Sequence, residues 1–156
     1  MKKAFTLIEI MMVVAIITLL AAIAIPNLLR SRISAQEAAA AAALYKILLA
    51  EDQWRIAHGS YANLSQLDDE TPPYIDAALA SGTKYEYNFS TPVYNATVFS
   101  AEAVQPSSRA HAFYIDDCAI LCRSNNLQSW RLGYRIGHAV GETYINCPMN
   151  YVPVGQ

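Results

Sequence analysis

A single long apolar run lies near the start of the chain. Between Phe5 and Ile25 the 21 residues include one charged side chain, Glu9. As a helix rising about 1.5 Å per residue, this run is about 32 Å long, which matches the hydrocarbon thickness of a bilayer. Two lysines precede the run and two arginines follow it, so the flanking charges only weakly favour a cytoplasmic N-terminus. The pattern predicts a membrane-spanning helix.

Helical periodicity resumes beyond Pro26. Proline removes a helical hydrogen bond and weakens a helix by about 3 kcal/mol, so we expect a kink at Pro26. Residues 27–57 contain no Gly or Pro and include six consecutive alanines, Ala38 to Ala43, which favour a helix. The larger apolar residues recur at spacings of three, four and seven and predict one packing face. This stripe comprises Leu29, Ile33, Ala40, Leu44, Ile47, Leu48 and Trp54.

The helix is expected to end at His58 and Gly59. Glycine tolerates the positive φ that closes many helices, and a polar residue suits the last turn. The whole helix then covers residues 5–58, with Glu51 and Arg55 as an exposed i, i+4 pair. Only its second half can pack on a soluble domain, so the protein should resemble a ladle with an apolar handle.

Strand patterns follow in the rest of the chain. A loop with a short helical turn is expected over 60–67, and alternating apolar residues predict a strand that begins at Lys84 and includes Phe89. Further strands are expected over 94–104 and 110–115, with a possible short one over 119–123. The sequence therefore predicts an α+β fold, in which a small antiparallel sheet covers the stripe of the helix.

Composition narrows the function. The chain has 156 residues, of which 54% are hydrophobic and 15% charged, so it is not a disordered chain. Its net charge is −2, and no basic face is visible, which argues against a specific nucleic-acid partner. There is no nucleophile elbow or phosphate-binding glycine loop, and none of the three histidines lies near a catalytic motif. We therefore expect no enzyme and no cofactor.

The residues Met1-Lys2-Lys3-Ala4-Phe5-Thr6-Leu7-Ile8-Glu9 closely resemble the leader and cleavage region of type IV prepilins and of the pseudopilins of type II secretion. The resemblance continues through the apolar run to Ala24-Ile25-Pro26-Asn27-Leu28. It implies that a prepilin peptidase cleaves between Ala4 and Phe5, that the new amino terminus is N-methylated, and that Glu9 serves assembly. Two residues depart from the family pattern: Ala4 stands where Gly is usual, and Ala62 replaces the Pro of the Gly-x-Tyr-Pro segment.

The chemistry of the residues agrees with this resemblance. Cleavage after Ala4 creates a cationic amine on Phe5, and neither this amine nor Glu9 is stable unpaired in an apolar core. At about 4 Å and an effective dielectric of 20 the pair gains roughly 4 kcal/mol, much of which desolvation offsets. Such a pair sets register more than it adds stability. The resemblance implies that it joins neighbouring subunits of a filament.

The N-terminal segment has two other possible interpretations besides a prepilin leader and helix. A secretory signal peptide would end in the small residues Ala22-Ile23-Ala24 and release a soluble domain. An ordinary signal anchor would leave Glu9 at the membrane interface without a role. The length of the run and the position of Glu9 disfavour the signal peptide, and the residues around Glu9 favour the prepilin resemblance over an ordinary anchor.

The three cysteines predict one disulfide and one remaining thiol outside the cytoplasm. Cys122 with Cys147 is favoured slightly over Cys118 with Cys147, and Cys118 with Cys122 remains open; the disulfide-closed tail loop of the family gives a loose precedent. A zinc site from the three cysteines and His138 has irregular spacing and is disfavoured. The acids Asp68, Asp69 and Glu70 lack the spaced ligands of a calcium loop. No metal is expected.

The sequence thus divides into a leader (1–4), a membrane or filament-core helix (5–29), its amphipathic continuation (30–58) and an α+β head with a C-terminal tail (59–156). We expect a subunit of a homo-oligomeric helical filament, with a pseudopilin of type II secretion or a secreted binding or zinc domain as alternatives. The resemblance implies lipid contact before assembly, and as partners a prepilin peptidase and methyltransferase, an inner-membrane assembly platform and a motor ATPase. The precursor would cross the inner membrane once, and the filament would be extracellular or periplasmic.

Overall fold

A computed structural model describes residues 5–91, 98–107, 109–117, 119–124 and 151–154 of the chain. Its first element is helix α1, Leu7–His58, which is continuous through Pro26. The chain separates into two compact units, Met1–Ala35 and Gln36–Gln156. The first unit carries the apolar part of the helix, and the second is the head. The expected helix of 5–58 is confirmed within two residues at its start.

The head holds the buried residues of α1. They lie on one face and are Ala40, Ala43, Leu44, Ile47, Leu48, Ala50 and Glu51. Ala40, Leu44, Ile47 and Leu48 belong to the predicted stripe, whereas the other three were not predicted to be buried. Leu29, predicted to belong to this face, is 56% exposed, because it precedes the part of the helix that the head includes. Trp54 is only partly buried. The packing face therefore begins at Ala40 and not at Leu29.

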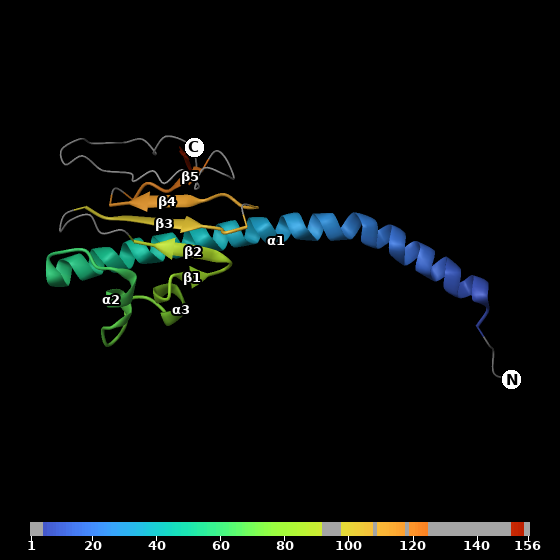
Figure 1. The fold of residues 1–156 in the computed structure, drawn as a ribbon, viewed down its shortest axis with the longest axis horizontal. Coiled ribbons are helices and arrows are strands. Elements are labelled where there is room, and N and C mark those ends of the chain that lie inside the picture. The colour runs from blue at the N-terminus through green and yellow to red at the C-terminus, as the bar shows by residue number, and fades with distance from the viewer. Residues whose placement is uncertain (1–4, 92–97, 108, 118, 125–150, 155–156) are drawn as a thin grey trace. The chain divides into compact units, whose positions relative to one another are not determined.

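A six-stranded antiparallel sheet runs in simple sequence order beside the head portion of α1 (Figure 1). Its buried side chains complete the core, with Tyr87, Phe99 and Ile115 among the largest. The strands are β1 Thr83–Lys84, β2 Tyr87–Ser90, β3 Ser100–Val104, β4 Phe113–Asp116, β5 Cys122–Ser124 and β6 Tyr151–Pro153. The predicted α+β architecture is confirmed.

The first predicted strand was wrong in one respect. Residues 84–89 do not form one strand, because the chain reverses at Tyr85 and Glu86, whose φ angles are 55° and 65°. Lys84 then pairs with Tyr87 across a two-residue hairpin. Two successive positive φ angles match the twist of a hairpin but are normally supplied by Asn or Gly, so a Tyr-Glu pair gives no turn signal.

Two short helices connect α1 to the sheet. The first, α2 Leu64–Asp68, confirms the helical turn expected over 60–67 and begins with a capping box between Asn63 and Gln66. The second, α3 Ala77–Ala80, was not predicted. Its N-cap is Asp76, whose side chain accepts a hydrogen bond from the backbone N–H of Leu79.

Candidate assembly site

The helix α1 begins with a capping box. The backbone N–H and the hydroxyl of Thr6 donate to Oε2 of Glu9 at 3.0 and 2.9 Å, and the N–H of Glu9 points back to the Thr6 hydroxyl at 3.4 Å. This arrangement satisfies backbone donors that the first helical turn leaves without partners. It also places a negative charge at the positive end of the helix dipole. Glu9 therefore has partners within its own chain.

Thr6 is a site residue that the sequence analysis missed. The spacing Thr-x-x-Glu before an apolar run is itself a capping signature and could have been recognised. Phe5, next to this box, is 80% exposed.

The first unit exposes an apolar surface along its helix. An 18-residue stretch of the helix near the N-terminus has a mean hydropathy of 2.8 and no buried residues, so the helix is long and apolar enough to cross a membrane. The hydroxyl of Thr18 donates to the carbonyls of Val14 and Ala15 at 3.0 and 2.9 Å. That polar group is thereby satisfied within the helix, as an apolar environment requires.

Pro26 lies inside α1, and the helix continues on both sides of it. Proline has no N–H to donate to the carbonyl of Ala22, so one helical bond is missing at this point. The kink that the sequence predicts here stays a prediction.

The segment that follows α1 closes the helix and contacts the core of the head. Gly59 takes a φ of 74° and donates its N–H to the carbonyl of Arg55 at 2.8 Å, which closes the helix as predicted. Tyr61 is buried and stacks on Phe99, with ring centroids 5.4 Å apart. The N–H of Ala62 donates to Oε2 of Glu51 at 2.9 Å. A proline at position 62 could not make this bond.

The expected pairing of Glu51 with Arg55 on the exposed side was wrong. Glu51 is fully buried, whereas the guanidinium of Arg55 lies 5.4 Å from the ring centre of Tyr61 and 3.8 Å from the carboxylate of Asp52. The spacing explains the error, because Glu51 follows Leu44 by seven positions and Ile47 by four. It therefore belongs to the buried stripe as well as to an i, i+4 charge pattern.

The candidate metal and disulfide residues lie partly outside the described segments. Cys122 is buried in β5, while Cys118, Cys147 and His138 are not among the described residues. The pairing of the cysteines therefore stays a prediction. Within the described part of the chain, no group of three or more His, Cys, Asp or Glu residues is placed to hold a metal ion. Of the three acids considered for a calcium loop, Glu70 instead lies near a histidine, with its Oε1 3.5 Å from Nε2 of His58.

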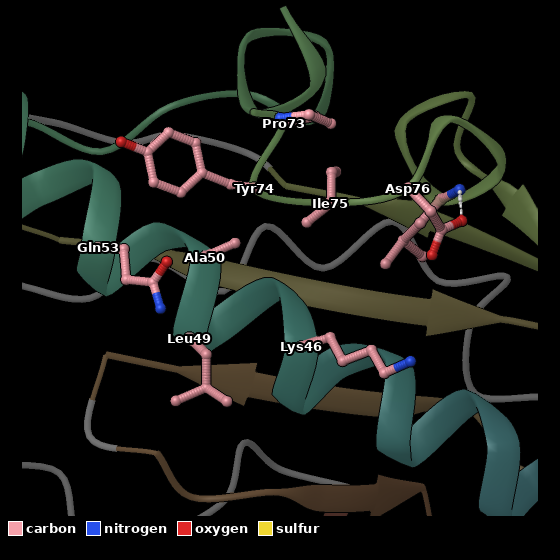
Figure 2. Close-up of a pocket in the computed structure, with 9 residues that line it drawn as sticks. Lys46, Leu49, Ala50, Gln53, Pro73, Tyr74, Ile75 and Asp76 are labelled. Carbon is pink, nitrogen blue, oxygen red and sulfur yellow. Dashed lines mark hydrogen bonds between the residues drawn. The ribbon is translucent and has the colours of Figure 1, made fainter. Parts of the chain in front are cut away.

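An open groove of about 490 Å³ lies between α1 and the segment that leads to α3 (Figure 2). Tyr74 and Ile75 extend over it from that segment, and Lys46 extends from the helix. Asp76 at its edge binds Lys84 at 2.7 Å, and this hydrogen bond lowers the pKa of the Asp76 carboxyl. The lining residues include no Ser, Cys or His, so they offer no common pair of nucleophile and base. They are Lys46, Leu49, Ala50, Gln53, Pro73, Tyr74, Ile75, Asp76 and Leu79.

An exposed apolar helix with a capped acidic residue in its first turn, followed by a small antiparallel sheet, defines a pilin-like subunit. The family model of the prokaryotic N-terminal methylation motif matches residues 1–25. The chain is also 41% identical, over 90 residues, to the major component PilA4 of the type IV wide pilus of Thermus thermophilus. That match covers 54% of this chain and 69% of the relative. No solved structure matches the chain. The chain belongs to the type IV pilin family, which confirms the resemblance seen in the sequence.

Proposed function

We propose that the protein is the structural subunit of a type IV pilus, cleaved between Ala4 and Phe5, N-methylated on Phe5 and assembled through its N-terminal helices. The exposed apolar face of α1 with Glu9 in its first turn carries this proposal. Outside lipid such a surface needs cover, and a bundle of identical helices supplies it. The relative is named as a pilus component, which favours a pilus subunit over a pseudopilin of type II secretion.

Glu9 would act by exchanging partners during assembly. Before assembly its carboxylate is held by Thr6, at 3.0 Å from the backbone nitrogen. Once the leader is removed, the cationic amine of Phe5 in a neighbouring subunit offers a partner of opposite charge. A charge pair in an apolar core is strongly position-dependent, so it would fix the axial register of the incoming subunit.

The remaining partners follow from this route. A prepilin peptidase with methyltransferase activity would process the precursor while α1 spans the inner membrane. An assembly platform and its motor ATPase would then draw the helix out of the lipid into the growing filament. The finished filament would lie outside the cytoplasm, with its subunits acting mechanically and not as enzymes.

Mass spectrometry of the N-terminal peptide from purified filaments tests the proposal. We expect the loss of residues 1–4 and an increase of about 14 Da, one methyl group, on Phe5. A soluble product that begins at Ile25 would instead indicate a secreted domain released by signal peptidase. An intact Met1 in purified filaments would contradict the assigned cleavage site.

A further inference from the structure

Glu51 is a buried carboxylic acid within the core of the head. Its side chain is 0% exposed, and it lies among the apolar residues of the α1 packing face. Oε2 accepts the N–H of Ala62 at 2.9 Å, which joins α1 to the segment beyond its end. Oε1 has no hydrogen-bond partner among the described residues. Most buried carboxylates have several donors, so this one is poorly stabilised in its charged form.

The surroundings of Glu51 oppose its ionisation. Burial raises the pKa of Glu51 to about 7; the bond from Ala62 acts in the opposite direction, and the neighbouring carboxylate of Asp52 adds to the increase. Tyr61, in the segment after α1, is close enough to Glu51 to be affected by its charge, and burial raises the pKa of the Tyr61 phenol. The charges that act on this phenol are Arg55, Asp117, Asp52 and Glu51.

The positive charge of Arg55 does not neutralise Glu51. Its guanidinium is about half exposed and lies 3.8 Å from the carboxylate of Asp52. It also lies over the ring of Tyr61, 5.4 Å from its centre. The partners of this cation are therefore Asp52 and Tyr61, and no ion pair of Glu51 is found among the described residues.

We propose that Glu51 is a proton-sensitive latch that holds the segment Gly59–Asn63 closed against α1 while its carboxyl is neutral. Ionisation of Glu51 leaves a charged Oε1 without a donor among the described residues of the core, so it favours states in which this site is hydrated. The bond from Ala62 favours the charged form and offsets only part of this cost. The segment supplies Tyr61 to the core through its stack on Phe99, so opening would expose a tyrosine near the end of the long helix. The latch depends on the head alone and is independent of how filaments assemble.

The sign of the effect follows from linkage. A carboxyl whose pKa is higher in the folded than in the unfolded state binds more protons when folded, so stability falls as pH rises between the two values. This pH window runs from 4.5, the ordinary pKa of a glutamic acid side chain, to about 7, the pKa of Glu51 in the folded protein. Above that window the loss is complete and stability no longer changes with Glu51.

The test compares the full-length chain, monomeric in detergent, with Glu51→Gln and with the matched control Asp69→Asn. Asp69 is an exposed acid outside the core. From pH 5 to 7.5 we expect the unfolding constant of the wild type and of the control to rise roughly 10- to 100-fold relative to Glu51→Gln. Equal pH dependence in all three proteins would overturn the latch.

A second measurement covers the case in which Glu51→Gln does not fold. The amide of Ala62 reports on the carboxylate it binds, so its NMR chemical shift in the wild type should titrate with a midpoint near the value of about 7. A midpoint in the ordinary range of a glutamic acid, or no titration, would refute the proposal. Because both experiments use unassembled protein, their failure would leave the pilus function untouched.

Discussion

The backbone nitrogen of Thr6 lies 3.0 Å from Oε2 of Glu9, and the hydroxyl of Thr6 lies 2.9 Å from the same oxygen. These hydrogen bonds change the interpretation of Glu9, the single charged residue of the apolar run. Its charge is not unpaired before assembly, because donors of its own chain already satisfy it. In the proposed assembly an incoming amine would compete with this existing cap, so Glu9 would also have a role in the unassembled subunit.

Replacing Thr6 with Val should loosen the start of α1. The variant keeps the shape of the side chain but loses the hydroxyl that both donates to and accepts from Glu9. The loss of such a cap costs about 0.5–2 kcal/mol. Amide exchange at residues 7–10 in detergent should therefore accelerate by roughly 2- to 30-fold. Thr6→Ser keeps the hydroxyl and should exchange like the wild type; equal protection in the Val variant would contradict the cap.

Replacing Glu9 with Ala should separate membrane insertion from assembly. Removal of a charge from an apolar run favours insertion, so membrane fractionation should show the variant at wild-type levels. Filaments should be absent by electron microscopy, because the variant cannot pair with the Phe5 amine. Glu9→Asp retains the charge on a shorter side chain and should assemble in reduced amount. Normal filaments from Glu9→Ala would remove the role assigned to this residue.

Long-range periodicity made most of the fold predictable. The apolar run and the spacing of Leu44, Ile47 and Leu48 gave the helix and its packing face, because a helical stripe repeats over many residues. The reversal at Tyr85 and Glu86 was not predictable, since neither residue favours positive φ and the hairpin is imposed by strand pairing. Local residue preference is a weak guide where tertiary contacts decide the backbone.

The residues of the candidate site, like the fold, were only partly predictable from the sequence. The motif around Glu9 was recognisable from the sequence, because isolated charges in apolar runs are rare, and the family model of the methylation motif matches the same region. The burial of Glu51 was obscured by Arg55, which offered an obvious partner four residues later. The structure instead assigns Arg55 to Asp52 and Tyr61. A sequence shows which charged residues are spaced to form ion pairs on a helix, but burial decides which of these ion pairs form.

Two leucines on the same helix should respond very differently to truncation. Leu44 is 0% exposed in the core, whereas Leu49 is 60% exposed along the groove. Leu44→Ala leaves a cavity and should cost about 2–5 kcal/mol of unfolding free energy. Leu49→Ala should change it by less than about 0.5 kcal/mol. Thermal or denaturant unfolding of the detergent-solubilised chain measures both, and similar losses would contradict the assigned packing face.

The disulfide prediction can be tested by peptide mapping without reduction. Cys122 is buried at the start of β5, so a bond from it to Cys147 would tie the C-terminal tail to the sheet. We expect a linked peptide pair that contains Cys122 and Cys147, with Cys118 alkylated as the remaining thiol. Removal of a native disulfide typically costs about 2–5 kcal/mol, so Cys147→Ser should lower the melting temperature of the head and Cys118→Ser should not. A linked Cys118–Cys147 peptide would support the alternative pairing, and three alkylated cysteines in protein isolated from outside the cytoplasm would contradict both.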